Sequence, residues 1–226
     1  MKKLLIASFF ITSLFSSEIN YKIGQEIYEL TCISCHGVDG TTQTEVKFVV
    51  RPRSLSSSIL NEEQSYKIIK KGSHYWGSVA DIMPAFDSIY DEKQLRSVAL
   101  YISKKFNPDA QKRVEKLYAQ SNLISKEKQI KMLKRGKKIY KRNCIWCHGP
   151  SGKGDGEATR NPEKSIYPYN LGKTLLTTKQ MFLYAKYGGK FWGTDKDDMP
   201  SWKRKYDDYT LKSVVKYIDK EFRGNR

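Results

Sequence analysis

Apolar positions recur at helical spacing near the end of each half of the chain. Residues 95–106 carry apolar side chains at i, i+3, i+4, i+7 and i+11, and residues 211–222 repeat this stripe. Such spacing predicts amphipathic helices that bury one side. Asp91 and Asp207 stand just ahead of the stripes, where a negative charge favours the helix dipole. Each half of the chain is therefore predicted to end in a long helix.

Shorter helices are predicted earlier in each half. Asn61 and Thr177 are each followed three residues later by Gln, which is the pattern of an N-terminal capping box. A first helix is expected from Tyr21 to a cysteine-containing segment, with its counterpart beginning near Leu133. Apolar residues alternating at period two are scarce. The predicted fold class is all-α.

The two halves are copies of one unit. Gly24 and Tyr28 return 112 positions later as Gly136 and Tyr140, and beyond the cysteine segments the offset becomes 116, as if four residues were inserted. A repeat held in register over this length indicates a duplicated domain. We assign the domains to residues 18–106 and 133–226, with a partly helical linker at 107–132 that could pack on one of them. The later matches pair Pro52, Leu55, Trp76, Gly77, Met83 and Pro84 with Pro168, Leu171, Trp192, Gly193, Met199 and Pro200.

The cysteines carry the candidate chemistry. Cys-Ile-Ser-Cys-His at 32–36 returns as Cys-Ile-Trp-Cys-His at 144–148, and these segments contain all four cysteines. Cys-x-x-Cys-His is the attachment signature of c-type haem. On a helical turn, positions i, i+3 and i+4 share a face, so two thiols and an imidazole reach one macrocycle. The sequence predicts two covalently bound haem c groups, attached at Cys32, Cys35, Cys144 and Cys147, with His36 and His148 as axial ligands.

Other uses of four cysteines fit less well. Two disulfides are compatible with export but would make the repeated five-residue motif a coincidence. In zinc sites, two Cys-x-x-Cys pairs are usually roughly 15–20 residues apart, whereas these are 112 apart. A thioredoxin-like redox pair requires a βαβ context, which the pattern lacks.

With these residues assembled, the chain resembles a tandem two-haem cytochrome c in which each half is similar to a class I cytochrome c. The resemblance covers nearly all of the chain after its first residues. Gly24 and Gly136 look like the family's crossing point between the first and last helices. The resemblance also implies that the carbonyls of Pro52 and Pro168 accept a hydrogen bond from Nδ1 of the motif histidines.

Methionine is the family's choice for the second axial ligand, and its soft sulfur raises the reduction potential. Met83 and Met199 each precede proline at matching positions, whereas Met132 and Met181 have no counterpart in the other copy. We predict Met83 and Met199 as axial ligands. His74 is the one histidine outside the motifs, and it remains a competitor for the first haem. Three histidines cannot fill four axial places, so bis-histidine ligation of both haems is excluded.

The net charge of +17 is uneven. Residues 18–106 carry 11 basic and 11 acidic side chains, whereas residues 135–226 carry 21 basic and 10 acidic ones. This asymmetry predicts a redox partner with an acidic docking face for domain 2. Membrane-surface association and a solvated face without a fixed partner remain alternatives. Nucleic acid is a poor fit for an exported haem protein.

The chain opens with a candidate leader. Two lysines follow Met1, an apolar run of twelve residues spans 4–15, and serines occupy 16–17. This is the pattern of a secretory signal peptide at 1–17, with cleavage expected after Ser16 or Ser17. Because a membrane span takes about 20 residues, a retained anchor is the less favoured alternative. Export agrees with the haem interpretation, since the resemblance implies attachment outside the bacterial cytoplasm, so we expect a periplasmic protein.

Two haems with both axial positions filled leave no open iron site for a substrate. The sequence therefore favours an electron-transfer protein, not an enzyme, that moves single electrons between respiratory redox partners. Two alternatives remain. One is a haem-containing subunit of a larger oxidoreductase complex, and the other is a two-haem peroxidase-type enzyme in which one iron loses its methionine.

Overall fold

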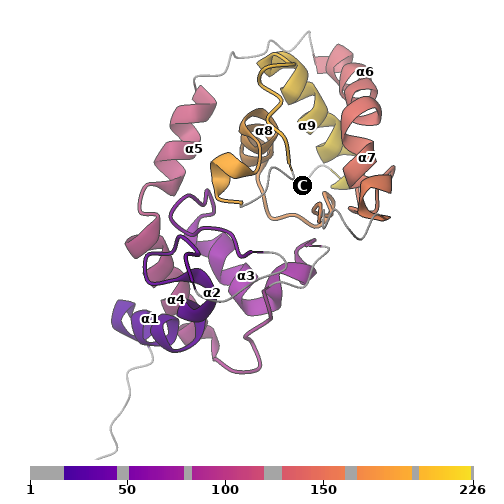
Figure 1. Ribbon diagram of the computed structural model, residues 1–226. Helices are drawn as coiled ribbons and strands as arrows, with labels where there is room; N and C mark the ends of the chain where they lie inside the picture. The colour runs from indigo at the N-terminus through magenta and orange to yellow at the C-terminus, as the bar shows by residue number, and fades with distance from the viewer. Residues whose placement is uncertain are drawn as a thin grey trace, which may run out of the picture.

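The computed structural model describes residues 18–44, 51–78, 83–119, 129–160, 167–194 and 199–224. The predicted signal peptide at 1–17 lies outside these residues. The described part contains helices and no strands, which confirms the all-α prediction. Figure 1 shows two groups of helices, one from each half of the chain, joined along one side by a separate helix. No helix in the described ranges is both long and apolar enough to span a bilayer.

The two groups have matching element orders. The first contains α1 (Tyr21–Ile27), the π-helical turn η1 (Tyr28–Cys32), α2 (Ile33–His36), α3 (Glu62–Tyr75) and α4 (Glu92–Phe106). The connecting helix is α5 (Ala110–Ala119). The second contains α6 (Gln129–Ile139), η3 (Tyr140–Cys144), α7 (Ile145–His148), the 3-10 turn η4 (Glu157–Arg160), α8 (Thr178–Tyr187), the 3-10 turn η6 (Lys190–Trp192) and α9 (Asp208–Phe222).

Helix starts follow the predicted caps. The Asn61 side chain accepts from the Gln64 amide at 2.8 Å, and Gln64 Oε1 accepts from the Asn61 amide at 3.0 Å, so α3 begins with a complete capping box. Thr177 forms the same box at α8. Asp91 and Asp207 cap α4 and α9. Helix α6 begins at Gln129, not near Leu133, because the residues ahead of Leu133 are compatible with a helix and extend it.

The first and last helices of each group cross at a glycine. A Cβ atom on Gly24 would lie 2.0 Å from the Ser97 carbonyl oxygen, and one on Gly136 would lie 2.0 Å from that of Ser213. A side chain at either position would separate the backbones. The structure thus confirms the predicted crossings of α1 with α4 and of α6 with α9.

Helix α5 joins the two groups by contacts at both of its ends. Near its start, Arg113 donates to the Ser58 carbonyl of the first group. Further along, Val114 is buried and the Tyr118 ring lies edge-on to Phe182 of α8, with ring centroids 5.7 Å apart. Between the two groups, residues 110–119 are therefore helical, and this helix packs on the second group.

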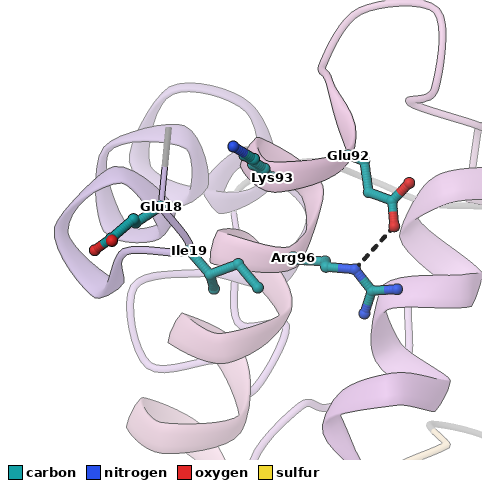
Figure 2. A pocket seen from close by; sticks show the side chains of 5 residues that line it. All are labelled: Glu18, Ile19, Glu92, Lys93 and Arg96. Carbon is teal, nitrogen blue, oxygen red and sulfur yellow. Dashed lines mark hydrogen bonds and ion pairs between the residues drawn. The ribbon is translucent and has the colours of Figure 1, made fainter. Parts of the chain in front are cut away.

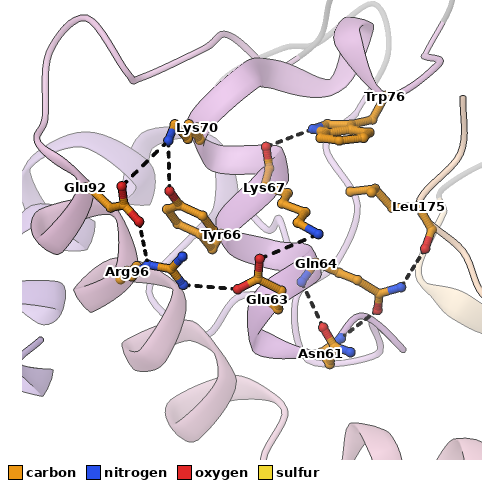
Figure 3. A network of polar contacts seen from close by, with 10 residues as sticks. All are labelled: Asn61, Glu63, Gln64, Tyr66, Lys67, Lys70, Trp76, Glu92, Arg96 and Leu175. Atoms are coloured by element: carbon orange, nitrogen blue, oxygen red, sulfur yellow. Dashed lines mark hydrogen bonds and ion pairs between the residues drawn. The ribbon is translucent and has the colours of Figure 1, made fainter.

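The two groups meet through a reciprocal pair of amides. Gln64 Nε2 donates to the Leu175 carbonyl at 2.7 Å and to Gln180 Oε1 at 2.9 Å. Gln180 Nε2 donates to the Ile59 carbonyl at 2.6 Å and to Gln64 Oε1 at 3.1 Å. Figure 3 shows Gln64 between its own cap residue and Leu175. Each amide group uses both its donors and both its acceptor positions, so this buried network is satisfied.

Backbone contacts follow the same symmetry. The Ser54 amide donates to the Gly193 carbonyl at 3.1 Å, and the Asn170 amide donates to the Gly77 carbonyl at 2.6 Å. Residues 54 and 170 occupy equivalent places in the repeat, and so do residues 77 and 193. The interface is therefore an approximate two-fold one, in which each copy offers the same surface to the other.

We predict that Gln180→Ala destabilises the protein by about 3 kcal/mol, because it leaves buried partners in both groups unsatisfied. The matched control is Gln94→Ala. Gln94 closes the capping box of α4 with Asp91, so its removal should cost about 1 kcal/mol. Denaturant unfolding of the full chain measures both values. Equal losses would show that the interface amides contribute no more than a cap.

Candidate functional site

Each Cys-x-x-Cys-His segment begins where the first helix of its group ends. Helix α1 continues into η1, which ends at Cys32, and Cys35 and His36 follow on the single turn of α2. Cys32 has helical φ and ψ of −96° and −27° and caps that turn. Two thiols and an imidazole therefore lie at i, i+3 and i+4 of a helical path. The second segment repeats the arrangement through η3 and α7.

A buried tyrosine ties the end of each segment to the preceding helix. Tyr28 Oη donates to the Gly37 carbonyl at 2.6 Å, and Tyr140 Oη donates to the Gly149 carbonyl at 2.7 Å. Burial raises the pKa of both phenols, so they remain neutral donors. The sequence identified these tyrosines as part of the repeat but did not reveal this bond.

The burial of two of the thiols weighs against redox exchange. All four cysteines are free of disulfides. Burial raises the pKa of Cys32 and of Cys144 to about 12. A thiol that resists ionisation is a poor nucleophile in disulfide exchange. In the described ranges, no three Cys, His, Asp or Glu side chains converge as a metal-ion cluster. The donor set thus fits covalent haem attachment better than the disulfide, zinc or thioredoxin-like alternatives.

Each imidazole faces a carbonyl from the segment that follows its motif. His148 Nδ1 lies 3.1 Å from the Tyr169 carbonyl oxygen. Burial lowers the pKa of His148, and this carbonyl opposes that effect. In the first group, burial likewise lowers the pKa of His36, and the Arg53 main chain opposes it. Within the described residues His36 Nδ1 forms no hydrogen bond of normal geometry, so the second imidazole is the better oriented.

The carbonyl partner differs from the expected one. The resemblance implied Pro52 and Pro168, whereas the carbonyl that faces the imidazole belongs to the next residue in each copy. The Leu171 amide donates to the Gly152 carbonyl at 2.7 Å, and an equivalent bond forms in the first group. This backbone bond anchors the segment beside the carbonyl that faces the ring.

The methionine loops are anchored to the ends of the middle helices. The Ser73 amide donates to the Met83 carbonyl at 2.9 Å, and the Gly189 amide donates to the Met199 carbonyl at 2.8 Å. Gly72, at φ 74°, lets the loop approach, since a Cβ there would lie 2.8 Å from the Met83 carbonyl oxygen. Gly188 has the same role opposite Met199. The repeat register could have identified both glycines, because they are 116 positions apart.

His74 and the two repeated tryptophans are the other residues that the sequence singled out. His74 is exposed at the end of α3, which weighs against it as a ligand. Trp76 Nε1 donates to the Lys67 carbonyl at 2.8 Å (Figure 3), and Trp192 Nε1 donates to the Leu183 carbonyl at 3.4 Å. Both tryptophans therefore support the middle helices.

A pocket of about 530 Å³ lies apart from these residues, at the start of α4 (Figure 2). Arg96 in its lining already has partners, since it contacts Glu92 at 3.1 Å and Glu63 at 3.0 Å. None of the predicted haem ligands contributes to it. The lining consists of Glu18, Ile19, Glu92, Lys93 and Arg96.

Comparison with known proteins agrees with the duplication. A family model described as cytochrome c oxidase, cbb3-type, subunit III matches residues 20–102 and again residues 131–218. Among solved structures, a chain of the Kuenenia stuttgartiensis reducing HAO-like protein complex Kustc0457/Kustc0458 is 22% identical, with a TM-score of 0.47. That alignment covers 92% of this chain and 98% of the other.

We predict that Gly72→Ala displaces the Met83 loop, because the added methyl group meets the Met83 carbonyl and φ is positive. If Met83 and Met199 bind the two irons, as the sequence predicts, the haem-loaded protein should lose about half of its methionine–iron charge-transfer absorbance. Gly188→Ala is the matched variant and should remove the other half. If either substitution left the band unchanged, the glycines would not position the loops.

Proposed function

This chain belongs to the family of cytochrome c oxidase, cbb3-type, subunit III, and from that membership we propose that it is an exported electron-transfer protein with two His/Met-ligated haems. The family implies covalently bound haem c, and the two Cys-x-x-Cys-His segments fit one haem each. We infer that single electrons pass through these haems between respiratory redox partners. The observation that carries the proposal is the recurrence, in both copies, of thiols, imidazole and anchored methionine in the same arrangement.

The residues divide into attachment and ligation. The thiols of Cys32, Cys35, Cys144 and Cys147 would form the covalent bonds to haem. His36 and Met83 would bind the first iron, and His148 and Met199 the second. A bound haem supplies a one-electron iron couple, whose potential a methionine ligand raises.

The surrounding residues hold these donors in place. Tyr28 and Tyr140 fasten the ends of the attachment segments to the helices before them. The Tyr169 carbonyl orients the His148 ring. Because both methionine loops are fixed by backbone bonds, neither iron would have an open position for a substrate. This supports electron transfer over the peroxidase-type alternative.

A second candidate function is a haem subunit of a larger oxidoreductase complex. The family description itself names an oxidase subunit, and this favours the alternative. The same haem-binding residues would serve either role. Co-purification of the chain with a membrane complex would distinguish a subunit from a free carrier.

The basic charge of the second group is concentrated beside its attachment segment. From residue 129 to residue 154 there are basic side chains and no acidic ones. Trp146 is 56% exposed within the motif itself. We propose that an acidic face of a redox partner docks here, because a local positive field raises association rates. The exposed basic residues are Lys131, Lys134, Arg135, Lys137, Lys138, Lys141, Arg142 and Lys153.

A spectroelectrochemical titration of the mature protein tests the ligation. We expect low-spin iron at both haems and a methionine–iron band that Met83→Ala halves, since one of two sulfur ligands is lost. His74→Ala is the control and should leave the band intact. A high-spin signal in the wild-type protein, or rapid turnover of peroxide, would contradict the carrier function.

Reversing charge at Lys137 and Lys141 together should slow oxidation of the reduced protein by ferricyanide at least tenfold at low ionic strength. The difference should vanish at high salt, where charges are screened. Lys104→Glu with Lys105→Glu, at the end of α4, makes the same change of charge in the first group. Equal effects from both pairs would mean that net charge, and not the basic surface of α6 and η3 beside the attachment segment, governs approach. Charge-dependent binding to anionic vesicles, with unchanged ferricyanide kinetics, would favour membrane association.

A further inference from the structure

The approximate two-fold axis brings two equivalent residues of unlike chemistry together. Arg53 and Tyr169 occupy the same place in the repeat, 116 positions apart. The Arg53 guanidinium carbon lies 4.5 Å from the centre of the Tyr169 ring. Arg53 Nη1 also donates to Tyr184 Oη at 2.9 Å. The side chain of a residue in the first group is thus held by two aromatic residues of the second.

The main chains of the same two residues face the two predicted iron ligands. The Arg53 main chain lies beside His36, and the Tyr169 carbonyl oxygen lies 3.1 Å from His148 Nδ1. Arg53 therefore contacts the first imidazole through its backbone. Through its side chain, it contacts the residue that orients the second imidazole. A short chain of contacts joins the two histidines across the interface.

We propose that Arg53 is a positioning residue through which the first domain tunes the second haem site. Its side chain places a fixed positive charge against Tyr169, whose carbonyl faces His148. The inference rests on the proposed function, since it concerns the haem that His148 would bind.

The physical effect is electrostatic. Among the described residues, no carboxylate forms an ion pair with Arg53. A partly buried cation is screened less than an exposed one, and it favours the less positive, reduced state of a nearby iron. Arg53 should thus raise the reduction potential of the second haem, although it belongs to the first domain.

A redox titration of the full haem-loaded chain, followed by proton NMR, tests the effect of Arg53 on the second haem. Each methionine methyl signal is assigned by its loss in Met83→Ala or Met199→Ala. In Arg53→Gln, the reduction equilibrium constant of the second haem should fall about tenfold, equivalent to about 59 mV for one electron. The control is Lys104→Gln, which removes an exposed charge from the last turn of α4 and should change it less than twofold.

Arg53→Lys distinguishes the effect of the positive charge from that of stacking on Tyr169. The lysine retains the charge but lacks the planar group that stacks on the ring. The second haem of this variant should therefore keep most of its wild-type reduction potential. If Arg53→Lys shifted the potential as far as Arg53→Gln, or if Arg53→Gln matched Lys104→Gln, the electrostatic role of Arg53 would be wrong while the carrier function stood. A wild-type protein without two low-spin haems would overturn both.

Discussion

The close crossing of the first and last helices is the contact on which each half of this protein depends. Gly24 and Gly136 allow one backbone to rest on another, and this fixes the direction in which α1 and α6 run into their attachment segments. The tyrosine one turn later then ties the far end of the segment back to the same helix. Two thiols and an imidazole are placed by backbone contacts and do not rely on mobile side chains.

Two glutamines that cap helices within their own copy also form the contact between the copies. Gln64 and Gln180 close the capping boxes of α3 and α8, and the same amides meet each other across the interface. Because every donor and acceptor of the pair is used, a rotation of one unit would leave buried polar groups unsatisfied. The interface therefore specifies one relative placement of the two attachment segments, which an electron-transfer protein with two centres requires.

The two copies share their chemistry but differ in electrostatics. Both contain the same thiols, imidazole and anchored methionine, so both suit the same prosthetic group. The excess of basic side chains is found in the second copy alone. A guanidinium of the first copy also reaches the aromatic residues that support His148. The two copies therefore share a fold and differ in surface charge.

The sequence by itself determined the features that depend on local order along the chain. Helical periodicity and capping residues predicted the fold class and most of the helix starts, because these features are encoded within a few turns of backbone. The glycine crossings were implied by the resemblance to class I cytochromes c, and the candidate ligands by the repeated motifs together with that resemblance. The tertiary structure decided that the carbonyl of Tyr169, and not that of Pro168, faces His148. It also decided that Gly72 and Gly188 admit the methionine loops and that Arg53 rests on Tyr169. These contacts join residues far apart in the chain, and their partners are set by how whole helices and domains pack.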